Sequence, residues 1–232
     1  MEAIILAGGF GTRLKNKIKN IPKPMALVNN KPFLDYILNY LNSNGVTKII
    51  LSVYYKSDVI KQYYNDNTFY NGIKITYSHD KAPLGTGGAI RAALTKSSND
   101  NVFVINGDTY FDVDLHLLMD KHVKNNNDIT LSLKPMSNFN RYGFVKTELD
   151  GNIIAFEEKK YQKYGKIDGG IYLINNNIFN SYKENKLFSF SDFIKNNLYN
   201  LKIGSVSFDG IFIDIGTPED LAKAQKIFKS QI

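Results

Sequence analysis

The sequence begins with an apolar run that meets a glycine-rich turn at once. Ala3–Ala7 contains only apolar residues, Gly8 and Gly9 follow directly, and Gly11 comes two residues later. Five apolar residues are long enough for a buried strand, and adjacent glycines permit a sharp turn after it. We therefore expect this run to be the first strand of an α/β unit.

Patterns typical of helices and strands alternate through residue 134. Apolar residues at helical spacing over 33–41, with Gly45 as a stop, predict one helix, and the apolar run 48–55 predicts the next strand. Ser57 and Asp114 are expected to cap two later helices. The remaining predictions are helices over 57–65, from 85 onward and over 115–125, and strands over 73–77, 102–106 and 129–134. This alternation favours a mostly parallel sheet covered by helices.

The alternation changes after residue 140. The ranges 144–149 and 152–157 flank Asp150-Gly151, which is typical of a two-residue β-hairpin turn. Further strands are predicted over 170–174, 203–208 and 212–215, before a final helix that starts at Thr217-Pro218. No repeat or low-complexity linker divides the 232 residues. We predict a single α/β domain, a Rossmann-like three-layer sandwich with a mixed, mostly parallel central sheet.

The composition excludes several kinds of site and partner. The chain has no cysteine, which rules out disulfides, thiolate metal sites and cysteine nucleophiles, and its three histidines lack metal-ligand spacing. The net charge of +7 is spread along the sequence, which argues against nucleic acid as a partner. The N-terminal apolar run is far shorter than the roughly 20 residues of a membrane span. We expect a soluble, cytoplasmic protein with no membrane partner.

The glycine-rich turn is the first candidate site. Backbone N–H groups of Gly8, Gly9 and Gly11 can approach a polyphosphate closely, and Arg13 and Lys23 can neutralise its charge. The motif is not a Walker loop, because Thr-Arg follows the last glycine, and it does not fit the dinucleotide pattern G-x-G-x-x-G. A tight turn beside two solvated cations would explain the same residues. The motif alone leaves both interpretations open.

Other motifs in the chain give this turn a more specific interpretation. LAGGFGTRL at 6–14 and PKPM at 22–25 resemble the signature of the sugar-1-phosphate nucleotidyltransferases. The resemblance continues through PLGTGGA at 83–89, NGD at 106–108, RYGFV at 141–145, EEK at 157–159, DGGIY at 168–172 and FIDIGTPEDL at 212–221. It covers essentially the whole chain. Members of that family transfer a nucleoside monophosphate from an NTP to a sugar 1-phosphate and release pyrophosphate.

The resemblance implies catalytic roles for Arg13, Lys23, Asp108 and Asp214. Asp108 and Asp214 would hold Mg²⁺ between the two substrate phosphates, and Arg13 would lie nearest the departing pyrophosphate. Without the resemblance, a carboxylate after a strand is more often a cap or a loop residue. The reaction needs no general base, because the second pKa of a phosphate monoester is about 6 and the group is already ionised at neutral pH.

The same resemblance implies two sets of binding residues. The nucleotide set lies within a mainly nucleotide-binding half, 1–135, and consists of Leu6, Ala7, Gly8, Gly9, Gly11, Thr12, Arg13, Lys23, His79, Gly85, Thr86, Gly87 and Asp108. Within it, the range 79–88 is expected to select the base. The sugar-phosphate set lies mostly within 136–232 and consists of Asn106, Gly143, Glu157, Lys159, Asp168 and Gly169. Lys159 would bind the phosphate of the sugar. Many relatives have Asn-Ala-Gly where this chain has Asp-Gly-Gly at 168–170, which leaves the sugar open.

The length of the chain and the residues of its motifs are most similar to family members that use GTP and D-glycero-α-D-manno-heptose 1-phosphate. That pair implies GDP-heptose for surface glycans such as capsule polysaccharide, with Mg²⁺ as cofactor. Alternatives in the family are mannose 1-phosphate with GTP and glucose 1-phosphate with UTP or dTTP. A transferase for a small-alcohol phosphate and a non-catalytic nucleotide-sugar sensor are further alternatives, although the retained charged residues argue against the sensor. The sequence is compatible with a homodimer but contains no motif that supports one.

Overall fold

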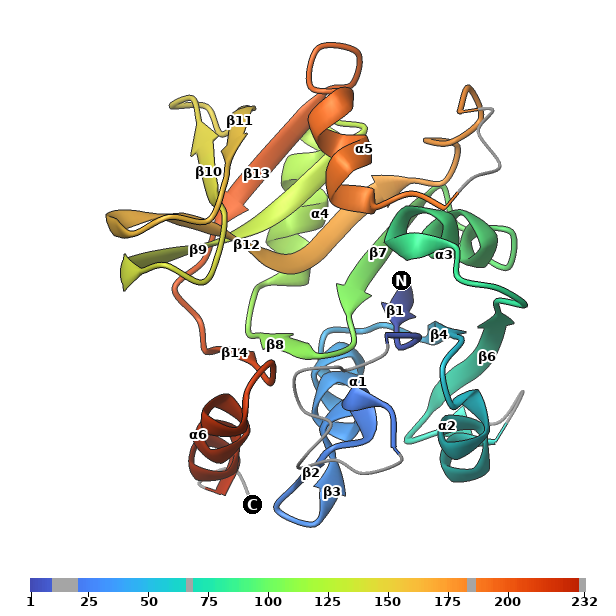
Figure 1. The fold of residues 1–232 in the computed structure, drawn as a ribbon. Helices are drawn as coiled ribbons and strands as arrows, with labels where there is room; N and C mark the ends of the chain where they lie inside the picture. Colours follow the sequence, from blue (N-terminus) through green and yellow to red (C-terminus); the bar gives the residue numbers. More distant parts are fainter. Residues whose placement is uncertain (10–20, 66–68, 183–186, 230–232) are drawn as a thin grey trace.

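An eight-stranded sheet forms the centre of the molecule (Figure 1). The computed structural model describes residues 1–9, 21–65, 69–182 and 187–229. The strands follow the order β13 (Ile203–Ser207), β9 (Ile129–Phe139), β12 (Gln162–Asn175), β7 (Asn101–Asn106), β1 (Glu2–Leu6), β4 (Lys48–Val53), β6 (Ile73–His79) and β5 (Phe69–Tyr70). The first apolar run of the chain therefore lies in the interior of the sheet, between β7 and β4.

The sheet is mixed, and its parallel part matches the alternating pattern of the sequence. β1 runs parallel to both β4 and β7, and β4 runs parallel to β6, so these strands end at one common edge. β12 is antiparallel to both of its neighbours, β7 and β9. The predicted mixed, mostly parallel sheet is confirmed.

Helices cover both faces of the sheet and complete three layers (Figure 1). One core cluster takes the apolar side chains of α1 (Phe33–Ser43), α2 (Ser57–Tyr64), α4 (Leu115–Lys124) and α6 (Pro218–Lys229). The second takes those of α3 (Gly85–Leu94) and α5 (Phe190–Asn196). Ala3 and Ile5 enter the first cluster and Ile4 the second, because successive residues of a strand point to opposite faces. This is why residues 3–6 of β1 are all apolar.

Three two-stranded sheets accompany the main one. β2 (Leu27–Val28) and β3 (Lys31–Pro32) are joined by Asn29 and Asn30, whose φ values of 47° and 65° suit the tight turn of a hairpin. β10 (Phe144–Thr147) pairs with β11 (Ile153–Glu157). β8 (Thr109–Phe111) pairs with β14 (Phe212–Asp214), which places residue 214 opposite residue 109. The last pairing joins two distant parts of the sequence.

Some local predictions are confirmed and others are wrong. The Asp114 carboxylate accepts a hydrogen bond from the Leu117 N–H at 2.9 Å and caps α4 as predicted. Ser57 is the first residue of α2 and not its cap, because Lys56 in a left-handed conformation precedes the helix. The turn between β10 and β11 is longer than two residues, since the Glu148 N–H donates to the carbonyl of Asn152 across a three-residue loop.

Helix α5 was not predicted from the sequence. Its seven residues are too few to show a helical period clearly, although Phe190, Phe193 and Ile194 are all buried. Among the described residues, no helix is both long and apolar enough to cross a membrane.

Candidate active site

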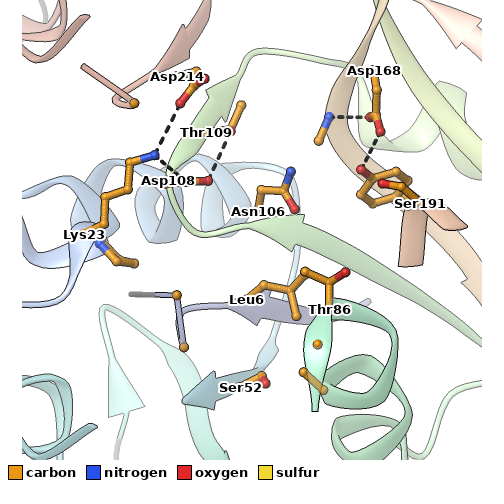
Figure 2. Close-up of a pocket in the computed structure, with 18 of the residues that line it drawn as sticks. Leu6, Lys23, Ser52, Thr86, Asn106, Asp108, Thr109, Asp168, Ser191 and Asp214 are labelled. Carbon is orange, nitrogen blue, oxygen red and sulfur yellow. Dashed lines mark hydrogen bonds and ion pairs between the residues drawn. The ribbon is translucent and has the colours of Figure 1, made fainter. Parts of the chain in front are cut away.

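A cavity of about 680 Å³ opens at the edge where the parallel strands end. Leu6, Ser52 and Asn106 line it from the ends of β1, β4 and β7, and the register places Leu6 opposite the other two. Loops that follow these strands, the beginning of α3, and segments of β12 and β14 also contribute to the wall (Figure 2). Open α/β sheets bind their ligands at this edge, and the volume suits a ligand of nucleotide size.

Two carboxylates from distant parts of the chain meet in this cavity, and we call Asp108 and Asp214 the acid pair. Asp108 follows β7, and Asp214 is the last residue of β14. The Lys23 Nζ lies 2.5 Å from Asp108 Oδ2 and 3.5 Å from Asp214 Oδ1 (Figure 2). The Lys23 side chain is only 14% exposed. Three of the four predicted catalytic residues are thus brought together, and Arg13 lies outside the described residues.

Lys23 is held by a short rigid segment. It begins a 3-10 helix, Lys23–Met25, in which Pro24 and Met25 are buried. Pro22 precedes this helix with extended backbone. Because prolines on both sides fix the backbone and two neighbours are packed into the protein, the amino group is directed at the acid pair.

Burial dominates the electrostatics of Asp214. Loss of solvent raises the pKa of its carboxyl, Lys23 lowers it, and the nearby Asp108 raises it again. The Tyr142 hydroxyl donates to Asp214 Oδ2 at 3.4 Å, and burial together with the charge of Asp214 raises the pKa of Tyr142 to about 12. The tyrosine is therefore a hydrogen-bond donor at neutral pH, and it supports the second carboxylate from the side of β10.

The predicted nucleotide residues divide into those that line the cavity and those that do not. Leu6, Gly8, Gly9, Lys23, Gly85, Thr86 and Asp108 line it. Ala7 is buried in the core, and Gly87 is buried against Phe188. His79 points its Nδ1 at Lys61 Nζ, 3.1 Å away, and is not in the wall. Gly11 and Thr12 lie, like Arg13, outside the described residues.

Asp80 lines the cavity; it lies in the range 79–88 that was expected to select the base, but the sequence did not single it out. It follows β6, it is 7% exposed, and burial raises the pKa of its carboxyl while the neighbouring His79 lowers it. The described part of the chain gives this carboxylate no hydrogen-bond donor. Its sequence signal, an acid just after a strand, is the same one that singled out Asp108.

Three predicted sugar-phosphate residues, Asp168, Asn106 and Lys159, also line the cavity. Asp168 accepts hydrogen bonds from the Gly170 N–H at 2.9 Å and from the Tyr172 hydroxyl at 2.6 Å (Figure 2). Burial raises the pKa of the Asp168 carboxyl, and these two hydrogen bonds lower it. The register of β12 against β9 shifts between Asp168 and Tyr172, and Gly170 has a φ of +76°. This β-bulge turns the carboxylate into the cavity.

Three predicted sugar-phosphate residues lie elsewhere. Gly169 points toward the core, where an added Cβ would come within 2.4 Å of the Phe111 ring. Glu157 forms ion pairs with Lys146 and with Lys160, the latter at 2.6 Å. Gly143 packs against the backbone oxygen of Glu157. None of the three is in the described wall of the cavity, whereas Arg141, Tyr142, Tyr172 and Ser191, which were not predicted, are.

Comparison with known proteins identifies the family. The profile of the nucleotidyl transferase family matches residues 2–231. The chain belongs to this family. The D-glycero-alpha-D-manno-heptose 1-phosphate guanylyltransferase of Campylobacter jejuni is 50% identical over 220 residues, which are 95% of this chain and 96% of that protein. The guanylyltransferase of the same name from Aneurinibacillus thermoaerophilus is 48% identical over 227 residues, 97% of each chain.

A solved structure agrees with this assignment. The crystal structure of HddC from Yersinia pseudotuberculosis complexed with GMP-PN has a TM-score of 0.87 and 36% sequence identity, and it covers 98% of this chain and 99% of that one. The predicted family and the predicted enzyme class, a nucleotidyltransferase, are confirmed.

The acid pair of this nucleotidyltransferase could hold a divalent cation. Both carboxylates converge on the point that the Lys23 ammonium approaches, so the site already accommodates positive charge. Mg²⁺ is commonly bound by one or two carboxylates and completed by substrate phosphates and water. Among the described residues no group of three His, Asp or Glu side chains could form an all-protein cage. The acid pair therefore fits a cation that arrives with a phosphate substrate.

Proposed function

We propose that the protein transfers GMP from GTP to D-glycero-α-D-manno-heptose 1-phosphate, giving GDP-heptose and pyrophosphate. The similarity to two guanylyltransferases that carry the name of this sugar phosphate supports both substrates, because it extends over almost the full length of each protein. The GMP-PN complex of HddC supports a guanine nucleotide independently. We place the reaction in the cytoplasm and its product in surface-glycan synthesis.

The observation that carries the proposal is the meeting of Lys23 with the acid pair inside the cavity. An oxygen of the sugar phosphate attacks the α-phosphorus of GTP, and the bond from that phosphorus to the β-phosphate oxygen breaks as pyrophosphate leaves. The two anions repel each other, so placement and charge neutralisation are the main requirements. Bound at the acid pair, Mg²⁺ would neutralise phosphate charge. Lys23 would then be free to contact the phosphates of GTP.

We propose that Asp80 reads the guanine base. Guanine presents two donors side by side, the N1–H and the 2-amino group, and a carboxylate can accept both at once. Asp80 is buried, faces the cavity and lies in the range expected to select the base. A uracil or thymine offers only one such donor, so this residue favours GTP over UTP and dTTP.

The acceptor is proposed to bind across Asn106, Lys159 and Asp168. Lys159 would pair with the phosphate, and the carboxylate of Asp168 would accept hydrogen bonds from sugar hydroxyls. In this arrangement residues 1–135 mainly serve the nucleotide and 136–232 mainly serve the sugar phosphate, as the sequence predicts. The roles of Glu157, Gly143 and Gly169 would be to support that wall and not to contact the sugar.

The proposal is tested by pyrophosphate release in the presence of Mg²⁺. GTP, UTP, CTP, ATP and dTTP are each combined with the 1-phosphates of D-glycero-α-D-manno-heptose, mannose and glucose, with an Asp214→Asn variant as the inactive control. Release with GTP and the heptose phosphate is expected to exceed every other pair. Preference for another pair would retain the chemistry and reject these substrates, and release from none would reject the enzymatic proposal.

A further inference from the structure

The beginning of α5 is fastened to the beginning of α3. The Phe190 N–H donates to Thr86 Oγ1 at 2.8 Å, the Gly87 N–H donates to the carbonyl of Phe188 at 3.0 Å, and the Phe188 N–H donates to that of Leu84 at 3.1 Å. These hydrogen bonds connect segments about a hundred residues apart, since Thr86 and Phe190 are separated by 104 positions. The motif PLGTGGA is therefore in direct contact with the segment that precedes α5.

Two glycines of this motif are explained by that contact. A Cβ on Gly87 would come within 2.1 Å of the Phe188 ring, and a Cβ on Gly85 would come within 2.3 Å of the Phe188 carbonyl oxygen. Gly85 also has a φ of +69°. Larger residues at either position would push the segment away from α3, so these glycines serve the packing of protein against protein.

A chain of contacts leads from Thr86 to the acceptor side of the cavity. The Phe190 ring, which is 3% exposed, meets the Tyr172 ring edge to face with centroids 5.2 Å apart. The Tyr172 hydroxyl donates to Asp168 at 2.6 Å. Asp168 is the carboxylate that β12 turns into the cavity. Thr86 itself lines the cavity, and its hydroxyl oxygen already accepts a hydrogen bond from the backbone of α5.

We propose that Thr86 is a positioning residue for the acceptor side: by accepting the Phe190 N–H, it fixes α5 and so holds Tyr172 and Asp168 in the orientation that binds the sugar. The inference rests on the proposed function and differs from the expectation that Thr86 contacts the nucleotide. It assigns to the helix beside the nucleotide a role in binding the second substrate.

The test is a steady-state comparison of Thr86→Val, Thr86→Ser and wild type, with GTP and the sugar 1-phosphate varied separately. Valine keeps the shape of the side chain but removes the acceptor, and the loss of one neutral hydrogen bond predicts a rise of about fivefold in the KM of the sugar phosphate. The KM of GTP should stay unchanged, and Thr86→Ser should restore the wild-type value because it retains the hydroxyl.

Thr95→Val is the matched control. Thr95 donates to the carbonyl of Ala92 at the other end of the same helix and does not line the cavity, so this variant should behave as wild type. A rise confined to the KM of GTP, or a fall of kcat with both KM values unchanged, would overturn the inference.

If the wild-type protein releases no pyrophosphate with any substrate pair, the proposed function is overturned instead. The inference is then decided by calorimetric binding of the sugar 1-phosphate. The same loss of affinity in Thr86→Val would support it, and equal affinities would reject it.

Discussion

The two ends of β1 lie beside buried carboxylates whose pKa values are shifted in opposite directions. At its amino end, Glu2 is 6% exposed and accepts hydrogen bonds from Ser97, from the backbone and hydroxyl of Ser98, and from Lys48. Burial alone would raise the pKa of Glu2, but these donors lower it to about 2. At the carboxyl end, by contrast, burial raises the pKa of Asp214.

The comparison distinguishes an acid that stabilises the fold, Glu2, from an acid that we propose binds a ligand, Asp214. A buried carboxylate supplied with donors stabilises the fold, because its charged form is already satisfied. A buried carboxylate with few donors is costly unless a cation or a substrate donor completes it. The number of hydrogen-bond donors around a buried acid, and not its position along the strand, thus decides whether its charged form is stabilised.

Removal of one member of the acid pair should have the largest effect. Asp108→Asn deletes the charge that faces Lys23 and the proposed cation, and we expect kcat to fall by about 10³-fold with the fold retained. Pyrophosphate release measures the rate, and thermal unfolding measures the fold. A variant with near-normal kcat would place Asp108 among the structural acids.

A smaller effect is expected at the end of β6. Asp80→Asn removes the charge from the two hydrogen bonds that we propose Asp80 makes to guanine, so kcat/KM for GTP should fall by about 10²-fold. Asp120, an exposed acid of α4, provides the control Asp120→Asn, which should leave kcat/KM as in wild type. Equal values for Asp80→Asn and this control would show that Asp80 does not read the base.

A substitution on the acceptor side of the cavity should change the KM of the sugar phosphate only. Lys159→Ala is expected to raise the KM of the sugar phosphate by about tenfold and to leave that of GTP unchanged, because it removes the charged contact that we propose Lys159 makes to the phosphate. Lys160→Ala is the matched neighbour, since Lys160 pairs with Glu157 and is absent from the described wall. The same rise in both variants would indicate a general loss of positive charge.

Glu2→Gln should have the smallest effect on catalysis and a clear effect on stability. At pH 7 we expect kcat/KM as in wild type and a free energy of unfolding lower by about 2 kcal/mol, because hydrogen bonds to a charged group are weakened. The pKa of Glu2 is lowered from 4.5 to about 2, so its contribution is present above pH 4.5.

Urea unfolding of wild type and Glu2→Gln between pH 7 and pH 2 tests the direction of this pH dependence. The difference in stability should shrink as pH falls from 4.5 toward 2 and the carboxylate of Glu2 becomes protonated in the folded state as well. A difference that is constant across this range would show that the ionised form contributes nothing.

The sheet could be predicted because its signals are local, whereas the acid pair could be predicted only through the resemblance of its motifs to a known family. The apolar run of β1 is visible in the sequence, and so are the acids that follow short strands. The family motifs distinguish Asp108 and Asp214 from other acids of this kind. The packing of Gly87 under Phe188 was not predictable, because it joins segments about a hundred residues apart. Glu157 was expected in the cavity, yet its two lysine partners depend on how the β10–β11 hairpin folds.

Asp80 and α5 show two further kinds of feature that the sequence alone does not predict. The acid at the end of β6 resembles many caps and loop residues, and only its burial beside the cavity distinguishes it. Helix α5 has too few residues for its period to be read, although Phe190 and Phe193 are both buried.

The pairing of β14 with β8 has a consequence for synthesis on the ribosome. Strand β7, which precedes Asp108, can pair with β1 as soon as residues 101–106 have been translated, but Asp214 is added only when residues 212–214 follow. At about 5–20 residues per second, the second carboxylate is delivered several seconds after the first. The nascent protein therefore has the parallel strands β1, β4, β6 and β7 well before it has the second carboxylate of the acid pair.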